Sequence, residues 1–139
     1  MRDRATVSVG QELPQLARVV TREDVKAYAD VGGDQNPLHQ DDAFARSAGF
    51  PGIIAHGMFT MGHMAAAIVA WAGEADAVLA ISAQFRAPVF IGETIVARGR
   101  VRSIEDRPAV AVLDAWVTVE RNGRTEWPVK KGEARVRLA

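Results

Sequence analysis

The sequence contains no cysteine in its 139 residues. This absence excludes a disulfide framework and a thiol nucleophile, and it fits a cytoplasmic protein. A chain of this length predicts one domain, residues 1–139, with a core of its own. Its start, Met1–Arg4, leads into no apolar run, so no secretory signal is visible.

The chain also lacks an excess of either charge, because 17 basic side chains are matched by 17 acidic ones. Proteins that bind nucleic acids or membrane surfaces favour a basic excess. The composition therefore predicts neither a nucleic-acid partner nor a membrane partner. A net charge of zero is compatible with an oligomer that hides part of its surface.

The segment between Gly57 and Gly73 contains no Asp, Glu, Lys or Arg, and its only ionisable side chain is His63. Its large apolar side chains point in every helical direction: Met58, Phe59, Met61, Met64, Ile68, Val69 and Trp71. A helix that is apolar all round must be surrounded by protein. This one is shorter than the roughly 20 apolar residues of a membrane span. We therefore expect a central core helix that is covered on most sides.

From Val78 onward the hydrophobic pattern changes to that of strands. We expect strands over 78–87, 94–104, 111–120, 124–129 and 133–138. Asn122-Gly123 is a strong hairpin signal, and Pro128 predicts an edge or a bulge.

The first part of the chain predicts smaller elements. We expect a strand near Leu16–Val20, a helix capped by Thr21 that ends at Gly32-Gly33, and a short helix from Asp41 to Gly49 with Phe44 and Ala45 inward. The overall class is then α+β, with one curved antiparallel sheet around the core helix. Because one sheet covers only part of a helix, we expect a second copy to close the rest.

The segment Gly33–His39 places a carboxylate and an imidazole, Asp34 and His39, five residues apart. Pro37 forbids a helix interior and pushes Asn36 toward an extended conformation, so the segment is a shaped loop that can aim both groups at one point. An acid and a base that converge can manage two proton positions on one substrate.

The segment Ala55-His56-Gly57 places a glycine at the expected start of the core helix. A helix N-terminus offers free backbone N–H groups and the positive end of the helix dipole. A carboxylate, an imidazole and such a donor together indicate proton chemistry next to a carbonyl group.

Tyr28 followed by Gly33-Asp34-Gln35-Asn36-Pro37-Leu38-His39 resembles the signature of the MaoC-like dehydratase and (R)-specific enoyl-thioester hydratase family. Ala55-His56-Gly57-Met58 and Thr60-Met61-Gly62 are similar to stretches of (3R)-hydroxyacyl-carrier-protein dehydratases in particular. The resemblance implies the hot-dog fold, in which a sheet wraps a long helix and two folds pair. It also implies reversible hydration of trans-2-enoyl thioesters to (3R)-3-hydroxyacyl thioesters.

The resemblance assigns roles as well. The Gly57 N–H would hold charge on the thioester oxygen, Asp34 and His39 would share the attacking water, and Asn36 would orient it. Which of the two side chains handles which proton stays open. The family needs no cofactor, and the spacing of these residues supports no metal site.

The remaining candidates carry weaker signals. We expect His56 and Met58 to contact substrate, although His56 could instead bond within its turn and hold the Gly57 amide. His63 is expected to be a core histidine. Met58, Met61 and Met64 form a stripe at helical spacing, which either packs in the core or forms a flexible wall for an acyl chain. Four arginines either supply charge at a tunnel mouth or lie on a solvated sheet face: Arg86, Arg98, Arg100 and Arg102.

Two other functions stay open from the sequence. One is an acyl thioesterase on the same fold, and the other is a non-catalytic subunit that shapes the acyl tunnel of a heterodimer. The sequence does not decide between acyl-CoA and acyl-carrier-protein substrates. It also leaves open whether the second hot-dog subunit is this chain, in a homodimer, or a different one.

Overall fold

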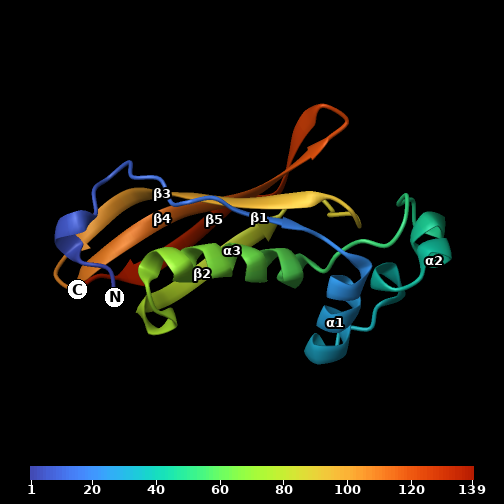
Figure 1. Ribbon diagram of the computed structural model, residues 1–139, viewed down its shortest axis with the longest axis horizontal. Coiled ribbons are helices and arrows are strands. Elements are labelled where there is room, and N and C mark those ends of the chain that lie inside the picture. Colours follow the sequence, from blue (N-terminus) through green and yellow to red (C-terminus); the bar gives the residue numbers. More distant parts are fainter.

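The computed structural model describes all of residues 1–139 and shows one twisted antiparallel sheet with a long helix along one face (Figure 1). The strand order across the sheet is β1-β3-β4-β5-β2. The strands are β1 (Leu16–Val19), β2 (Val78–Phe85), β3 (Thr94–Asp106), β4 (Ala109–Arg121) and β5 (Arg124–Arg137). The helices are α1 (Arg22–Gly32), α2 (Asp42–Ser47) and α3 (Gly57–Ala72), and short 3-10 turns cover Arg4–Thr6, Pro37–His39 and Ala75–Ala77.

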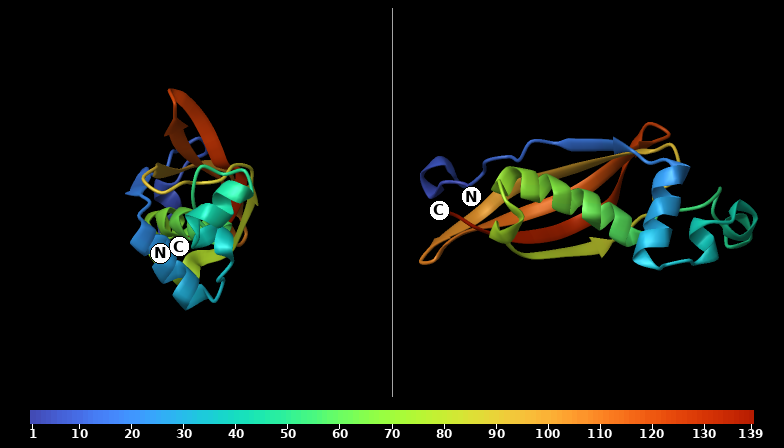
Figure 2. Two further views of the ribbon diagram at one scale, coloured as in Figure 1. Left: turned by 90° about the vertical axis from the view of Figure 1, so that its right-hand side faces the viewer. Right: turned by 60° about the horizontal axis from the view of Figure 1, so that its bottom comes forward.

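The predicted α+β architecture is confirmed. Figure 1 and the right-hand view of Figure 2 show α1 and α2 beyond the end of the sheet, next to the N-terminus of α3, while the two chain termini lie near the opposite end. This arrangement places the loop Gly33–His39 close to the start of α3. No helix is both long enough and apolar enough to cross a membrane.

Helix α3 is buried over most of its circumference. Met64, Ile68 and Trp71 are buried against the sheet within a cluster of 24 buried residues. The opposite stripe is exposed and consists of Met58, Gly62, Ala66 and Ala70. Because only this narrow stripe is exposed, the prediction of a core helix covered on most sides is confirmed, and the stripe is the part that the sheet of this chain does not cover.

The start of α1 agrees with its sequence signals. Thr21 Oγ1 accepts a hydrogen bond from Asp24 N at 3.1 Å, and Asp24 Oδ2 accepts one from Thr21 N at 3.3 Å. Gly33 ends the helix with a φ of 76°, a left-handed conformation that glycine adopts without strain. In α2, Ala45 is buried as expected, but Phe44 is largely exposed. A helix of six residues presents only one narrow face to the core, so the inward prediction for Phe44 is wrong.

Strand β5 is one continuous strand rather than the two that the sequence predicts. Its pairing with β4 shifts register between Ala115 and Val117 and again between Val117 and Val119, so the predicted bulge near Pro128 is confirmed. Gly132 lies opposite Ala115, where an added Cβ would stand 2.7 Å from the Ala115 carbonyl oxygen. The bulges and this close approach let β5 run unbroken through Lys130, Lys131 and Gly132.

Replacing Gly132 with alanine should destabilise the fold by roughly 1–3 kcal/mol, because the new methyl group meets a strand carbonyl and the Met64 side chain. The matched control is Gly62→Ala on the exposed side of α3, where an added Cβ has no neighbour within 4 Å. That change should stabilise the helix by about 0.5–1 kcal/mol. Urea unfolding of the two variants tests this, and equal midpoints would contradict the packing argument.

Candidate active site

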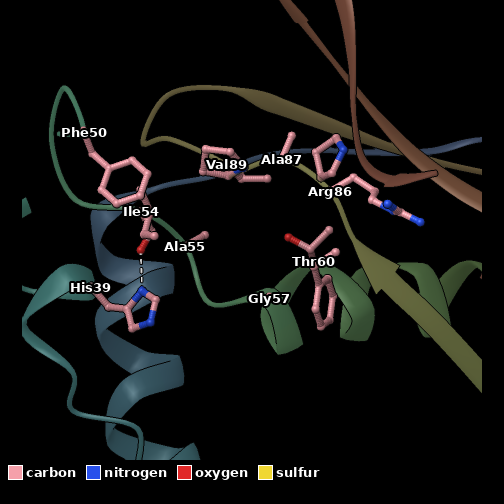
Figure 3. Close-up of a pocket in the computed structure, with 12 residues that line it drawn as sticks. His39, Phe50, Ile54, Ala55, Gly57, Thr60, Arg86, Ala87 and Val89 are labelled. Atoms are coloured by element: carbon pink, nitrogen blue, oxygen red, sulfur yellow. Dashed lines mark hydrogen bonds between the residues drawn. The ribbon is translucent and has the colours of Figure 1, made fainter. Parts of the chain in front are cut away.

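A cavity of about 400 Å³ opens at the N-terminal end of α3 (Figure 3). Two of the predicted site residues, His39 and Gly57, line it. The rest of its wall comes from the segment before α3, the first turn of α3, the end of β2 with the segment after it, and β5: Phe50, Ile54, Ala55, Thr60, Phe85, Arg86, Ala87, Pro88, Val89 and Pro128. The wall is mostly apolar, as suits an acyl chain, with few polar groups to orient a ligand.

The loop Gly33–His39 is shaped by its own side chains. Asp34 Oδ1 accepts a hydrogen bond from Asn36 N at 3.2 Å, and Asn36 Oδ1 accepts one from Leu38 N at 3.0 Å. Pro37 then begins the 3-10 turn Pro37–His39, where its missing N–H costs nothing. The predicted shaped loop is present, and it turns His39 back toward the start of α3.

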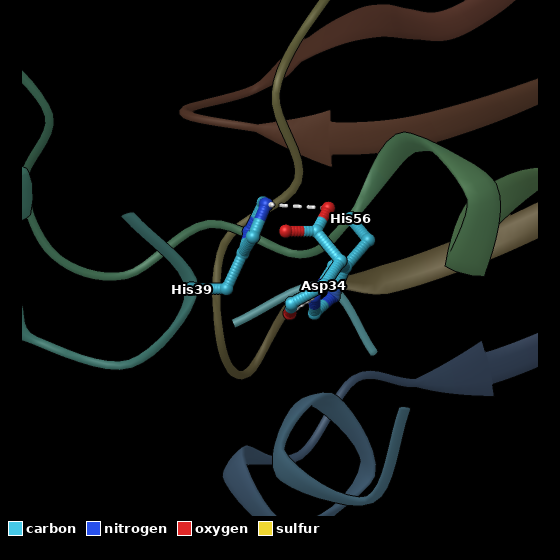
Figure 4. Close-up of side chains that lie close together, drawn as sticks. All are labelled: Asp34, His39 and His56. Carbon is cyan, nitrogen blue, oxygen red and sulfur yellow. Dashed lines mark hydrogen bonds and ion pairs between the residues drawn. The ribbon is translucent and has the colours of Figure 1, made fainter. Parts of the chain in front are cut away.

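Asp34 and His39 converge as the sequence predicts. His39 Nδ1 lies 2.7 Å from the Ile54 carbonyl oxygen, which can only accept, so Nδ1 carries the hydrogen. The other ring nitrogen, Nε2, faces Asp34 Oδ2 at 3.9 Å (Figure 4). This separation is too long for a direct hydrogen bond and leaves room for an oxygen atom to bridge the two groups.

Gly57 supplies the start of α3. As the first helical residue its N–H has no partner within the helix. A Cβ on this residue would stand 3.0 Å from the Phe85 ring, so only glycine keeps the space beside that N–H open without displacing Phe85. The free amide and the positive end of the helix dipole therefore border the cavity on the wall that His39 also lines.

His56 lies behind the cavity rather than on its wall. Its side chain is 2% exposed, and its Nε2 donates a hydrogen bond to the Asp34 carbonyl oxygen at 3.0 Å. The alternative of a side-chain hydrogen bond within its own turn is not realised, because the His56 ring instead bonds to the loop at Asp34. The ring stacks on His39 with centroids 3.7 Å apart and contacts Tyr28 at 4.9 Å.

The other predicted residues lie outside the cavity wall. Asn36 shapes the loop from the surface, and the Met58 side chain is 54% exposed on the far stripe of α3. The substrate contacts of Asn36, His56 and Met58 stay predictions. Met64, the third of the methionines that the sequence places at helical spacing, is fully buried in the core.

Only one of the four arginines considered for the tunnel mouth reaches the cavity. Arg86 lines it, and its guanidinium extends away from His39 (Figure 3). Arg98, Arg100 and Arg102 alternate along β3 with buried residues and face away from α3, where Arg102 bridges Asp114 and Glu133. They lie on the outer face of the sheet, so the tunnel-mouth alternative is wrong for these three.

Asp34, His39 and His56 bring potential metal ligands within 4.8 Å of one another. However, His39 Nδ1 and His56 Nε2 are both bonded to main-chain carbonyls. Stacked imidazoles direct their remaining lone pairs along nearly parallel planes rather than at one ion. The geometry therefore suits proton chemistry better than tetrahedral metal binding.

Some contributors to the site carried no signal in the sequence. Phe85 reaches the cavity because the end of β2 passes the start of α3. The Ile54 carbonyl, which orients His39, is a main-chain group that any residue type could offer. Tyr28 was visible as part of the family signature, but its contact with His56 depends on how α1 packs against α3.

Comparisons with known proteins agree with this geometry. The family described as MaoC like domain matches residues 5–122, so the chain belongs to the MaoC-like dehydratase family. A mitochondrial 3-hydroxyacyl-[acyl-carrier-protein] dehydratase of Arabidopsis thaliana is 40% identical over 98 residues, which cover 70% of this chain and 57% of that protein. An (R)-specific enoyl-CoA hydratase of Aeromonas caviae is 30% identical over 109 residues, which cover 78% of this chain and 81% of that protein.

The structural comparison identifies the fold. An (R)-hydratase structure from A. caviae, described as involved in PHA biosynthesis, superposes with a TM-score of 0.85 at 28% identity, covering 96% of this chain and 98% of that one. The fold is the predicted hot-dog fold. The chain spans little more than half of the plant dehydratase and 22% of a plant peroxisomal enoyl-CoA hydratase 2.

His63 is the core histidine that the sequence predicts. It is buried on the side of α3 that faces β1, and its Nε2 donates a hydrogen bond to the Leu16 carbonyl oxygen at 2.7 Å. Burial lowers the pKa of His63 below its ordinary value of 6.5, and the nearby Arg18 charge acts in the same direction. The hydrogen bond to Leu16 opposes this shift only in part.

This pKa shift predicts a loss of stability in acid. Below pH 6.5 the unfolded chain protonates His63 more readily than the folded chain does, so the free energy of unfolding falls as the pH drops. In His63→Gln this contribution is absent, so its free energy of unfolding should decline less between about pH 7 and pH 5. Urea unfolding of both proteins across this range checks the difference, and parallel declines would show that His63 does not titrate differently in the two states.

Proposed function

We propose that this protein catalyses the reversible hydration of trans-2-enoyl thioesters to (3R)-3-hydroxyacyl thioesters, as a hydro-lyase. The observation that carries the proposal is the convergence of Asp34 Oδ2 and His39 Nε2, 3.9 Å apart, beside a cavity that Gly57 lines at the start of α3. Two relatives named as a dehydratase and a hydratase of such thioesters support the same reaction.

The chemical difficulty lies at the thioester oxygen. Water adds its hydroxyl to C3 and a proton is delivered to C2, and negative charge builds on the oxygen while C2 lacks that proton. In the proposed complex the Gly57 N–H donates to this oxygen, aided by the helix dipole. One such donor is typically worth about 3 kcal/mol of the activation barrier.

The Asp34 and His39 pair would hold the water. Nδ1 of His39 is bonded to Ile54, so its Nε2 lone pair and the Asp34 carboxylate are the two groups free to accept a proton. The pair takes one proton from water and gives one to C2, so its total charge is restored after each turnover. Each member is then worth roughly 100- to 10,000-fold in rate.

The proposal extends to the assembly. The exposed stripe of α3 and the edge strand β2, with Leu79 and Phe85 exposed, favour a second hot-dog subunit, either another copy of this chain or a different one. Residues 1–139 are proposed to form one domain, since Arg4 N and the Arg2 carbonyl both bond to Ala139. The thioester carrier, coenzyme A or a carrier protein, and the cytoplasmic location stay predictions.

A direct assay separates the proposed function from its alternatives. Crotonyl-CoA mixed with the purified protein should lose its enoyl absorbance without release of free thiol, because hydration leaves the thioester intact. Thiol release would favour a thioesterase. Neither change, repeated with longer enoyl-CoA substrates, would favour a non-catalytic subunit and contradict the proposal.

The acid–base pair is tested by Asp34→Asn and His39→Ala. Each should lower kcat for hydration by at least about 100-fold while the circular dichroism spectrum is retained. Asp41→Asn is the matched control: it removes the same charge from the same region, and Asn serves equally well at the N-cap of α2 that Asp41 occupies. Hydration at wild-type rates by either test variant would show that the pair is not catalytic.

A further inference from the structure

His56 occupies the N-cap of α3 without capping it. N-cap residues usually accept a hydrogen bond from the first turn, a role for which Ser, Thr, Asp and Asn are preferred. The His56 side chain makes no such bond. Its ring is 2% exposed, and its Nδ1 atom is buried without a partner. A buried acceptor without a partner costs stability, so neither the helix nor the core explains a histidine here.

Two contacts of the His56 side chain lead to the acid–base pair. Its Nε2–H donates to the Asp34 carbonyl oxygen at 3.0 Å, across 22 residues of sequence. Its ring stacks on His39 with centroids 3.7 Å apart and planes inclined by 25°, and Figure 4 shows the three side chains gathered at one point. Tyr28 packs against the same ring at 4.9 Å. The next residue in the chain is Gly57.

We propose that His56 is a positioning residue that holds Asp34 and His39 in register with the Gly57 amide. The inference rests on the proposed function of the site and adds a role for a side chain that does not line the cavity. His56 connects the loop that carries the acid–base pair to the helix end that carries the amide. It does so through the main chain of Asp34 and the ring of His39.

Both members of the pair need this support. The Asp34 side chain is exposed, and it accepts only a local bond from Asn36 N. A single hydrogen bond to Ile54 holds His39 at one ring atom and still lets the ring tilt about that bond. The flat face of His56 restricts the tilt, and its Nε2–H restrains the loop. Such restraint matters because a misplacement of about 1 Å can cost on the order of 100-fold in rate.

Two substitutions separate the contacts of His56. His56→Gln places an amide donor near the former Nε2 and removes the stacking face, whereas His56→Phe keeps a flat ring and removes the donor. The matched control is His63→Gln, which alters the other buried histidine of α3. Like His56, His63 donates a hydrogen bond from Nε2 to a main-chain carbonyl, that of Leu16, and His63 does not line the cavity.

Steady-state hydration kinetics near neutral pH give the first readout. Both His56 variants should lower kcat by roughly 10- to 100-fold, with KM changed less than about threefold, because the reacting groups are misplaced while the cavity is intact. His63→Gln should keep the wild-type kcat even where its urea midpoint falls. If the His56 variants lose stability but retain kcat, the residue is only structural and the proposal is overturned.

A second readout does not depend on activity. The chain has three histidines, so their ring protons can be assigned by NMR. The His39 signals should shift in both His56 variants and stay in place in His63→Gln. Unmoved His39 signals would overturn the positioning role, whatever the activity. Shifted signals in a protein that hydrates no enoyl thioester would instead support the positioning role and refute the proposed function.

Discussion

The site depends on the attachment of one loop to the segment that leads into α3. Three hydrogen bonds make this attachment, and each uses a main-chain carbonyl: Ile54 N donates to Leu38 O, His39 Nδ1 donates to Ile54 O, and His56 Nε2 donates to Asp34 O. Because both of the segments that meet here are irregular loops, ordinary sheet pairing could not set their register. The two histidine side chains do so in its place.

The apolar character of α3 serves both stability and the site. Its buried face anchors the helix on the sheet through Met64, Ile68 and Trp71, which sets where its N-terminus lies. An anchored helix end keeps its free N–H groups and its dipole in a fixed direction, which is the preorganisation that stabilises developing negative charge. The exposed stripe on the other side of the same helix leaves room for a second subunit. Core packing and the geometry of the donor therefore cannot be changed independently.

Charge is distributed around this centre in a consistent way. The arginines of β3 lie on the outer sheet face, where Arg102 is neutralised by Asp114 and Glu133. The cavity wall keeps Arg86 as its one basic side chain apart from the imidazole of His39.

The sequence by itself determined the fold class, the shaped loop with Asp34 and His39, and a glycine at the start of the core helix, because turn residues, capping residues and hydrophobic periodicity act locally. It could not show that β5 runs unbroken through its bulges, that Phe44 faces outward, or that Arg86 alone of four arginines reaches the cavity. These outcomes depend on strand register and on which elements meet. The bond from His56 to Asp34 and the stack on His39 were decided only in three dimensions, since they join residues whose local patterns carry no information about each other.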